Sequence, residues 1–324
     1  MKGLIAILAI HGWAGAILAG AVLLLPLVVQ SAYYLDILIL TFLWAGLAGA
    51  WNLAGGYAGQ FSLGHAAFFG IGAYTSSLLF VHYKLSPLLG VFAGAALVGV
   101  FAFVIGGITF RLRGPYFTLA SIAFAEVVFV LGNYWRALTR GAEGLEIPFV
   151  PSFINLMFQS KVAYAYLAGA YMLFVFVLAV LIERSRLGFY MIAYREDEEA
   201  AESVGINTYR VKLFALTASA MLTAVGGTFY AQYILFLEPA TVFSLDVSIQ
   251  MALISIIGGL GTALGPVIGS VLLTPLSMFL RAWFGGGYAG LHLLIYGIVL
   301  IVVVLFVRDG LVALVRRLWR RVTP

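Results

Sequence analysis

The sequence predicts an all-α fold: a polytopic membrane protein of about ten transmembrane helices with both termini inside. Composition is the first observation behind this prediction. The chain has 324 residues, of which 63% are hydrophobic and 10% are charged, and its mean hydropathy is +1.08. Soluble domains hold about 45–50% apolar and about 25% charged residues. Residues 1–324 are therefore predicted to form a single transmembrane domain, without a separate soluble one.

The second observation is the set of long apolar segments. About 20 apolar residues cross a bilayer as a helix, because a helix satisfies its own backbone polar groups where no water is available. The third segment is interrupted by glycine and polar residues at its start, and the eighth is short. The ten segments are approximately 4–29, 34–54, 62–82, 88–110, 115–133, 162–183, 212–235, 246–260, 264–283 and 291–307.

The first of these segments is predicted to be a retained helix. A signal peptide has an apolar region of about 7–15 residues before its cleavage site, whereas this run continues to Val29. His11 lies within it and is expected to face neighbouring helices.

The third observation is the distribution of positive charge. With the N-terminus placed inside, 13 of the 18 Lys and Arg residues fall on the inner side of the ten-span topology and five on the outer side. Cytoplasmic loops of membrane proteins carry such an excess, so the pattern favours N-in and C-in. Residues 308–324 then form a basic cytoplasmic tail beside anionic membrane lipid, which gives no indication of nucleic-acid binding.

The loop at 184–212 concentrates the charge, with five consecutive charged residues at 195–199. We predict a short helix here, because Asp197 or a neighbour can cap it and acidic residues suit its first turn. Ala200, Ala201 and Val204 would form a small apolar face, and Gly205 would end the helix. Such a helix can dock in a groove of another protein. The alternative is a solvated loop whose charge serves only to fix the membrane topology of the neighbouring spans.

The glycine-rich stretch GGYAGQFSLGHAAFFGIG, beginning at Gly55, carries the polar side chains Gln60, Ser62 and His65. Transporters often bind solutes at interrupted helices, where open backbone faces a cavity. One hypothesis is that this stretch lines a translocation path. The other is dense helix packing in which Gln60 and His65 bond to neighbouring helices.

Glu126 is an acidic residue well inside a predicted span. Because a charge at the centre of a membrane helix costs about 2.5–3.5 kcal/mol, it should face a cavity or a partner. In the functional hypothesis, Glu126 lines the translocation path or relays protons. In the alternative, its carboxyl forms hydrogen bonds between helices. The stretch from Gly258 to Gly269 is predicted to be a tight hairpin with Pro266 in the first turn of its second helix.

Several chemistries are excluded or disfavoured by the sequence. The chain has no cysteine, so thiolate chemistry is excluded, and four histidines without a ligand cluster predict no metal site. No Gly-x4-Gly-Lys-Ser/Thr phosphate loop is present. No catalytic set stands out, and we therefore predict a non-catalytic protein.

The chain resembles the LivM-type permeases, the membrane subunits of branched-chain amino-acid ABC importers. Glu199-Ala200-Ala201, three residues and Gly205 match EAA-x3-G, the loop by which importer permeases couple to their ATPases. Here KLFALTAS follows, where the broader importer loop has an Ile-x-Leu-Pro ending. The other stretches that carry the resemblance are NLAGGYAGQFSLGHAAFFGIGAY from Asn52, RLRGPYFTLASIAFAE from Arg111, LTRGAEGL from Leu138, the remainder of AYREDEEAAESVGINTYRVKLFALTASAMLTAVGGTFYA from Ala193, and IGGLGTALGPVIGS from Ile257.

The resemblance implies a permease in a bacterial-type inner membrane. Its implied partners are two ABC ATPase subunits that bind the ATP and Mg, a second homologous permease, and an extracytoplasmic solute-binding protein. The chain itself would hold no cofactor. The coupling residues would be Glu198, Glu199, Ala200, Ala201, Val204 and Gly205, within a cytoplasmic coupling loop at 184–212.

Three alternatives remain open from the sequence. The solute of an ABC permease of this kind could be a sugar, urea or an amide instead of an amino acid. The chain could be a stand-alone secondary transporter that uses Glu126 as proton carrier. A polytopic membrane enzyme is disfavoured, because no catalytic set is found.

Overall fold

A computed structural model describes residues 2–110, 112, 114–284, 294, 297–298, 301 and 310–313, with side chains from Trp13 onward. The described chain divides into two compact units. Unit 1 comprises Met1–Gly49, Lys161–Leu181 and Leu253–Pro324, and unit 2 comprises Ala50–Ser160 and Ile182–Ala252.

Unit 1 is built from apolar helices joined by buried hydroxyl groups. Ser255 Oγ donates to the carbonyl of Ala48 (2.9 Å), and Ser270 Oγ donates to the carbonyl of Thr41 (2.7 Å). In lipid, where apolar contact alone gives little preference, such bonds and small residues hold helices together. The helices are α1 (Lys2–Val28), α2 (Ala32–Asn52), α7 (Lys161–Glu183), α12 (Leu245–Gly258) and α13 (Gly265–Phe284), of which α2, α7 and α12 continue into unit 2.

Unit 2 contains four long helices and several short elements. The long helices are α3 (His65–Tyr83), α4 (Pro87–Thr109), α5 (Pro115–Tyr134) and α10 (Thr208–Ile234). The short elements are the π-helix η1 (Leu53–Tyr57), α6 (Arg136–Thr139), the 3-10 helix η2 (Gly141–Glu143), β1 (Leu145–Glu146), α8 (Arg186–Glu196), α9 (Glu198–Ser203), β2 (Phe236–Leu237) and α11 (Pro239–Val242).

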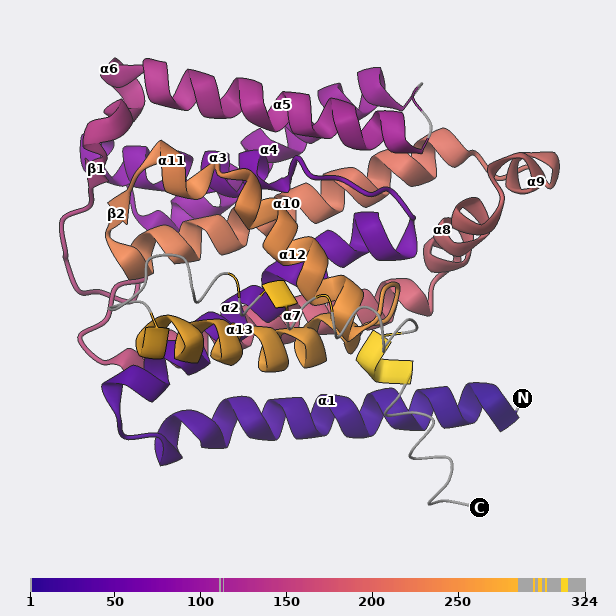
Figure 1. The fold of residues 1–324 in the computed structure, drawn as a ribbon, viewed down its shortest axis with the longest axis horizontal. Helices are drawn as coiled ribbons and strands as arrows, with labels where there is room; N and C mark the ends of the chain where they lie inside the picture. The colour runs from indigo at the N-terminus through magenta and orange to yellow at the C-terminus, as the bar shows by residue number, and fades with distance from the viewer. Residues whose placement is uncertain are drawn as a thin grey trace. The chain divides into compact units, whose positions relative to one another are not determined.

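The short elements of unit 2 gather at its two ends (Figure 1). At one end β1 and β2 pair antiparallel, with Leu145 opposite Leu237 and Glu146 opposite Phe236, and α6 and α11 lie near them. At the other end lie α8 and α9. The helices α3, α5 and α10 run between these ends, so they can connect events at one end with events at the other.

The contact between α3 and α10 depends on glycine. A Cβ added at Gly227 would lie 2.1 Å from the carbonyl oxygen of Phe69, so any larger residue would force the two backbones apart. Beside it, Thr228 Oγ1 donates to the carbonyl of Gly72 (3.2 Å). The apolar core of this unit lies against the same helices, and its buried members are Phe68, Val98, Ala102, Phe110, Phe117, Leu216, Ala220 and Ala224.

The structure confirms a polytopic α-helical protein. In the described residues, seven helices are long and apolar enough to cross a membrane, and they correspond to seven of the ten predicted segments. The predicted segment 62–82 is α3, which is not among the seven, and the first is α1, whose apolar part with described side chains runs from Trp13 to Val28. The predicted tenth span (291–307) and basic tail (308–324) lie outside the described residues except at 294, 297–298, 301 and 310–313.

Two local predictions are confirmed. The helix predicted from residue 62 begins at His65, after an interruption at residues 58–64. The glycine-rich hairpin joins α12 to α13, with Pro266 as the second residue of α13, and Thr262 Oγ1 accepts a hydrogen bond from the backbone N–H of Gly265 (3.1 Å).

Candidate functional site: a short acidic helix and a neighbouring cavity

The acidic run forms the short helix α9, as predicted from its capping pattern. Asp197 ends α8 in an extended conformation and is the N-cap of α9, where its Oδ1 accepts a hydrogen bond from the N–H of Ala200 (3.0 Å). Two carboxylates, Glu198 and Glu199, occupy the first turn. Their charge stabilises the positive end of the helix dipole.

The end of α9 is a Schellman motif. The N–H of Gly205 bonds to the carbonyl of Glu202 (2.9 Å), and the N–H of Ile206 bonds to the carbonyl of Ala201 (3.1 Å), which is the hydrogen-bond pattern of this motif. Gly205 has φ of +87°, a left-handed conformation that glycine adopts without steric penalty. Both ends of this six-residue helix are therefore fixed by local sequence.

The residues of the predicted apolar face point in different directions. Ala201 is buried, whereas Ala200 and Glu199 are exposed and Val204 is 76% exposed. Ala201 thus attaches the helix to unit 2, and Ala200 and Val204 remain accessible to another protein. A helix this short is unstable in water by itself, so its attachment to unit 2 is what keeps it folded.

Two polar contacts hold α9 on the first turns of α10. Lys212 Nζ lies 2.6 Å from Glu198 Oε1, with the two side chains 7% and 18% exposed, and Thr208 Oγ1 donates to Glu202 Oε1 (2.5 Å). The ammonium group of Lys212 also lies 5.1 Å from the ring centre of Tyr194, on α8. Removing one partner of a buried ion pair is strongly destabilising, so this pair fixes the position of α9.

A second link joins α8 to the interrupted helix. Arg195 donates from Nη1 to the carbonyl of Gly56 in η1 (3.1 Å), and Tyr57 donates from its hydroxyl to Glu183 Oε2 (3.0 Å). A π-helix leaves carbonyl groups in unusual positions, and it occurs frequently at functional sites. The helix α8, which directly precedes the acidic helix, is therefore joined through Arg195 to the glycine-rich stretch, which is far from it in sequence.

His65 is buried in a closed hydrogen-bond network. Its Nε2 lies 2.7 Å from Ser219 Oγ and its Nδ1 lies 3.2 Å from Ser62 Oγ. Because Ser219 Oγ donates its single hydrogen to the carbonyl of Ala50 (2.6 Å), the N–H must be on Nε2, and Nδ1 accepts from Ser62. These contacts favour the packing interpretation for His65 and Ser62, since neither ring nitrogen is left to bind a solute.

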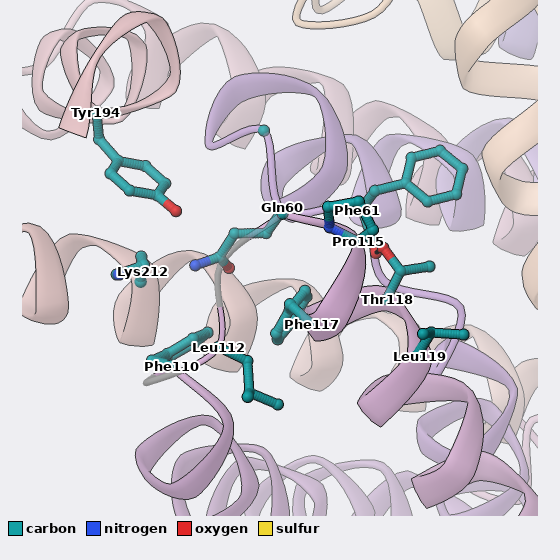
Figure 2. Close-up of a pocket in the computed structure, with 12 residues that line it drawn as sticks. Gln60, Phe61, Phe110, Leu112, Pro115, Phe117, Thr118, Leu119, Tyr194 and Lys212 are labelled. Carbon is teal, nitrogen blue, oxygen red and sulfur yellow. Dashed lines mark hydrogen bonds between the residues drawn. The ribbon is translucent and has the colours of Figure 1, made fainter.

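Gln60 differs from these two residues, because it lines a cavity of about 440 Å³ (Figure 2). The residue is 4% exposed, and neither its Nε2 nor its Oε1 has a hydrogen-bond partner among the described residues. Burying an amide without a partner costs about 1–3 kcal/mol in proteins, and such groups are rare. Of the three polar residues in this stretch, Gln60 alone faces open space in this way.

Glu126 lies on the exposed face of α5. Only 22% of the apolar window of this helix is buried, Glu126 is exposed, and Val127 beside it is 57% exposed. Glu126 has no hydrogen bond or ion pair with any described residue, so the described part of the chain supplies no partner for a bonded interhelical carboxyl. Within the described part of the chain, no group of three or more His, Cys, Asp or Glu residues could hold a metal ion.

Lys212, Arg195 and Tyr194 belong to this site but were not identified from the sequence. Each is a common residue in a charged loop or at a helix start, without a motif around it. Glu198 and Lys212 are separated by 14 residues, and their meeting depends on the turn at Gly205. Only the lone lysine near the start of an apolar helix could have served as a signal, because such a charge needs a partner.

Comparison with known proteins places the chain in a family. Residues 33–304 match the family described as "Branched-chain amino acid transport system / permease component". The high-affinity branched-chain amino acid transport system permease proteins LivM of Escherichia coli K12 and of Salmonella typhimurium LT2 are each 31% identical to the chain over 268 residues. These alignments cover 74% of this chain and 61% of each relative, so the chain spans about three fifths of the length of these relatives.

A shorter similarity extends to another permease. The autoinducer 2 import system permease protein LsrC of Yersinia enterocolitica is 30% identical over 132 residues, which is 38% of this chain and 37% of the relative. No solved structure matches the chain. Among the described residues, seven helices are long and apolar enough to cross a membrane. Together with the similarity to bacterial permeases, they indicate a multi-pass protein of the bacterial-type inner membrane. The chain belongs to the family of permease components of branched-chain amino acid transport systems.

Proposed function

We propose that the chain is the membrane-spanning, non-catalytic permease subunit of an ABC importer. It crosses the membrane ten times with both termini inside, and two partner ATPases, which bind ATP and Mg, drive alternating access. The observation that carries this proposal is the surface presentation of α9. The helix is capped at both ends, attached through Ala201, and exposes Ala200 and Val204 beside the acidic Glu199.

The proposed transmission runs from α9 into the long helices of unit 2. A partner that moves α9 pulls on α10 through the Glu198–Lys212 pair and on η1 through Arg195. Because α10 packs against the backbone of α3 at Gly227, a shift of α10 moves α3 as well. The residues Glu198, Glu199, Ala200, Ala201, Val204 and Gly205 would form the coupling site.

We propose that a second, homologous permease packs against the exposed face of α5. A carboxylate such as Glu126 is unfavourable against lipid, by about 2.5–3.5 kcal/mol at the centre of a membrane helix. Contact with another permease, or with water in a path between the two, would remove this cost. In this proposal Glu126 lines the path, Ser62 and His65 support its wall, and Gln60 lies where the path meets the α9 side, in the cavity shared with Lys212.

The proposed solute is a branched-chain or related apolar amino acid, delivered by an extracytoplasmic solute-binding protein. The names of the LivM relatives support this solute, whereas LsrC is named for a different one. The β1–β2 end of unit 2, opposite α8 and α9, would receive the binding protein. If the partner binding protein instead preferred a sugar, urea or an amide, that compound would replace amino acids as the proposed solute.

Purification without added bait tests the proposal. The chain, expressed with its native partners, should retain two ATPase subunits, and vesicles containing the complex should accumulate leucine only when ATP is supplied. The competing hypothesis of proton-coupled transport through Glu126 makes the opposite prediction. If vesicles that contain this chain alone accumulated leucine in response to a pH gradient, the ABC assignment would be wrong.

A further inference from the structure

The cavity beside Gln60 has the polar and apolar groups of a small-molecule site. Its volume of about 440 Å³ lies in the range of ligand pockets. The side-chain amide of Gln60 is buried, unpaired among the described residues, and points into the open space (Figure 2). An amide offers both a donor and an acceptor, so the ligand that satisfies it needs both kinds of group.

Three further polar side chains, those of Thr118, Tyr194 and Lys212, and several aromatic rings line the same space. Thr118 Oγ1 already donates to the carbonyl of Phe61 (2.7 Å). Lys212 brings a positive charge, already paired with Glu198 at 2.6 Å, and Tyr194 lies beside it (Figure 2). The apolar part of the wall consists of Phe61, Phe110, Leu112, Phe117 and Leu119. A ligand that matches these groups has a compact polar head together with an apolar body. An anionic group on that head can compete with Glu198 for Lys212.

We propose that this cavity binds an amino acid with an apolar side chain, as the zwitterion. The carboxylate would lie against Lys212 and the amide N–H groups of Gln60. The ammonium group would donate to Gln60 Oε1 and lie near aromatic faces, which attract cations. The apolar side chain would pack against Phe61 and Phe117.

The position of Lys212 gives this site a regulatory role. A bound carboxylate competes with Glu198 for the same ammonium group, and Glu198 is the first residue of α9. Occupancy therefore weakens the attachment of α9 to α10 and reduces coupling to the ATPases. Resting on the proposed function, this role makes the site a cytoplasmic sensor by which accumulated solute slows its own import.

Direct binding tests the site. The full chain, purified in lipid nanodiscs with whatever subunits accompany it and without a solute-binding protein, should bind radiolabelled leucine saturably. Gln60→Leu should weaken this binding roughly ten-fold or more, because hydrogen bonds to charged groups are lost. Gln159→Leu, the same change at an exposed residue, should have no effect. Saturable binding that is equal in both variants, or no binding at all, would overturn the proposal.

Two measurements separate this site from a structural role of Gln60. Gln60→Leu should leave the thermal stability unchanged or higher, because it removes a buried amide without a partner; a loss of stability large enough to explain the lost binding would contradict the proposal. 4-Methylpentanoate, which is leucine without the ammonium group, and isopentylamine, which is leucine without the carboxylate, should compete poorly with leucine. Equal competition by either compound would contradict zwitterion recognition.

The regulatory role is tested in vesicles that contain the complete importer. Leucine on the α9 side should inhibit ATP hydrolysis in the wild type. In Gln60→Leu the inhibited fraction, taken relative to the variant's own rate without leucine, should fall to near zero. If the importer moves leucine but is inhibited equally in both, the regulatory inference fails and the proposed function stands. If leucine binds in a Gln60-dependent manner to a complex that does not transport it, the site stands and the proposed solute is wrong.

Discussion

Ala200→Arg is expected to abolish most of the ATP hydrolysis that solute stimulates in the reconstituted importer. Ala200 is exposed on α9, between the buried Ala201 and the exposed Glu199, so an arginine there occupies the space where an ATPase would contact the helix. A packed contact at the centre of an interface contributes about 2 kcal/mol or more, which corresponds to roughly 30-fold weaker association. The two quantities to measure are the amount of ATPase that co-purifies with the variant and the rate of ATP hydrolysis.

The matched control is Ala137→Arg. Ala137 is an exposed alanine of α6, at the end of unit 2 away from α9. This variant should retain the ATPases and their hydrolysis in the absence of a solute-binding protein. If Ala200→Arg retained its ATPases as fully as the control does, and kept the solute-stimulated hydrolysis of the wild type, α9 would not be the coupling element.

Lys212→Met is expected to produce the second large loss. The substitution leaves Glu198 partly buried without its cation, and breaking a buried ion pair in this way costs about 3 kcal/mol. We expect α9 to detach from α10, and solute-stimulated hydrolysis to fall at least as strongly as in Ala200→Arg. Protease sensitivity of the 197–207 segment should rise at the same time, and both quantities can be measured on one preparation.

Two variants separate the ion pair from a general charge effect. Lys161→Met removes a lysine whose partner Asp36 lies at 2.6 Å, but these side chains are 41% and 29% exposed, so the pair is worth about 0–1 kcal/mol. It should behave as wild type. The double variant Lys212→Met with Glu198→Gln leaves no unpaired charge and should recover part of the lost attachment. An equal loss in Lys161→Met would refute the specific role of Lys212.

Local sequence predicted α9 because its signals act over a few residues. Asp197 and Gly205 each act within one turn, through a side-chain cap and a left-handed residue, so their effect can be read without a fold. The contacts that give the helix its place could not be predicted in this way. Glu198 meets Lys212, and Arg195 meets Gly56, only after the whole of unit 2 has folded.

The polar residues of the glycine-rich stretch illustrate the same limit. Gln60, Ser62 and His65 lie within six residues and looked equivalent in the sequence. Ser219 and Ala50 complete the network of His65, and they come from distant parts of the chain. The amide of Gln60 has no hydrogen-bond partner among the described residues, and the lack of a partner leaves no local pattern in the sequence.

The orientation of α5 likewise could not be predicted from the sequence. Its composition predicts a span, but the position of Glu126 on an exposed face depends on how α5 packs in unit 2. The apolar pattern of a membrane helix is nearly uniform around its axis, so it carries little information on which face is covered.

The sidedness of α9 tests the central claim most directly, because only a helix on the cytoplasmic side can meet an ATPase. The chain contains no cysteine, so a single cysteine can be introduced without altering any other residue. Val204, the C-cap of α9, and Phe153 are the positions chosen, and their native side chains are 76% and 71% exposed. Phe153 lies between the fifth and sixth predicted spans, in a segment that the N-in topology places outside. A membrane-impermeant maleimide should label Phe153→Cys in intact spheroplasts and Val204→Cys only in inside-out vesicles. Labelling of Val204→Cys from outside intact spheroplasts would contradict the account.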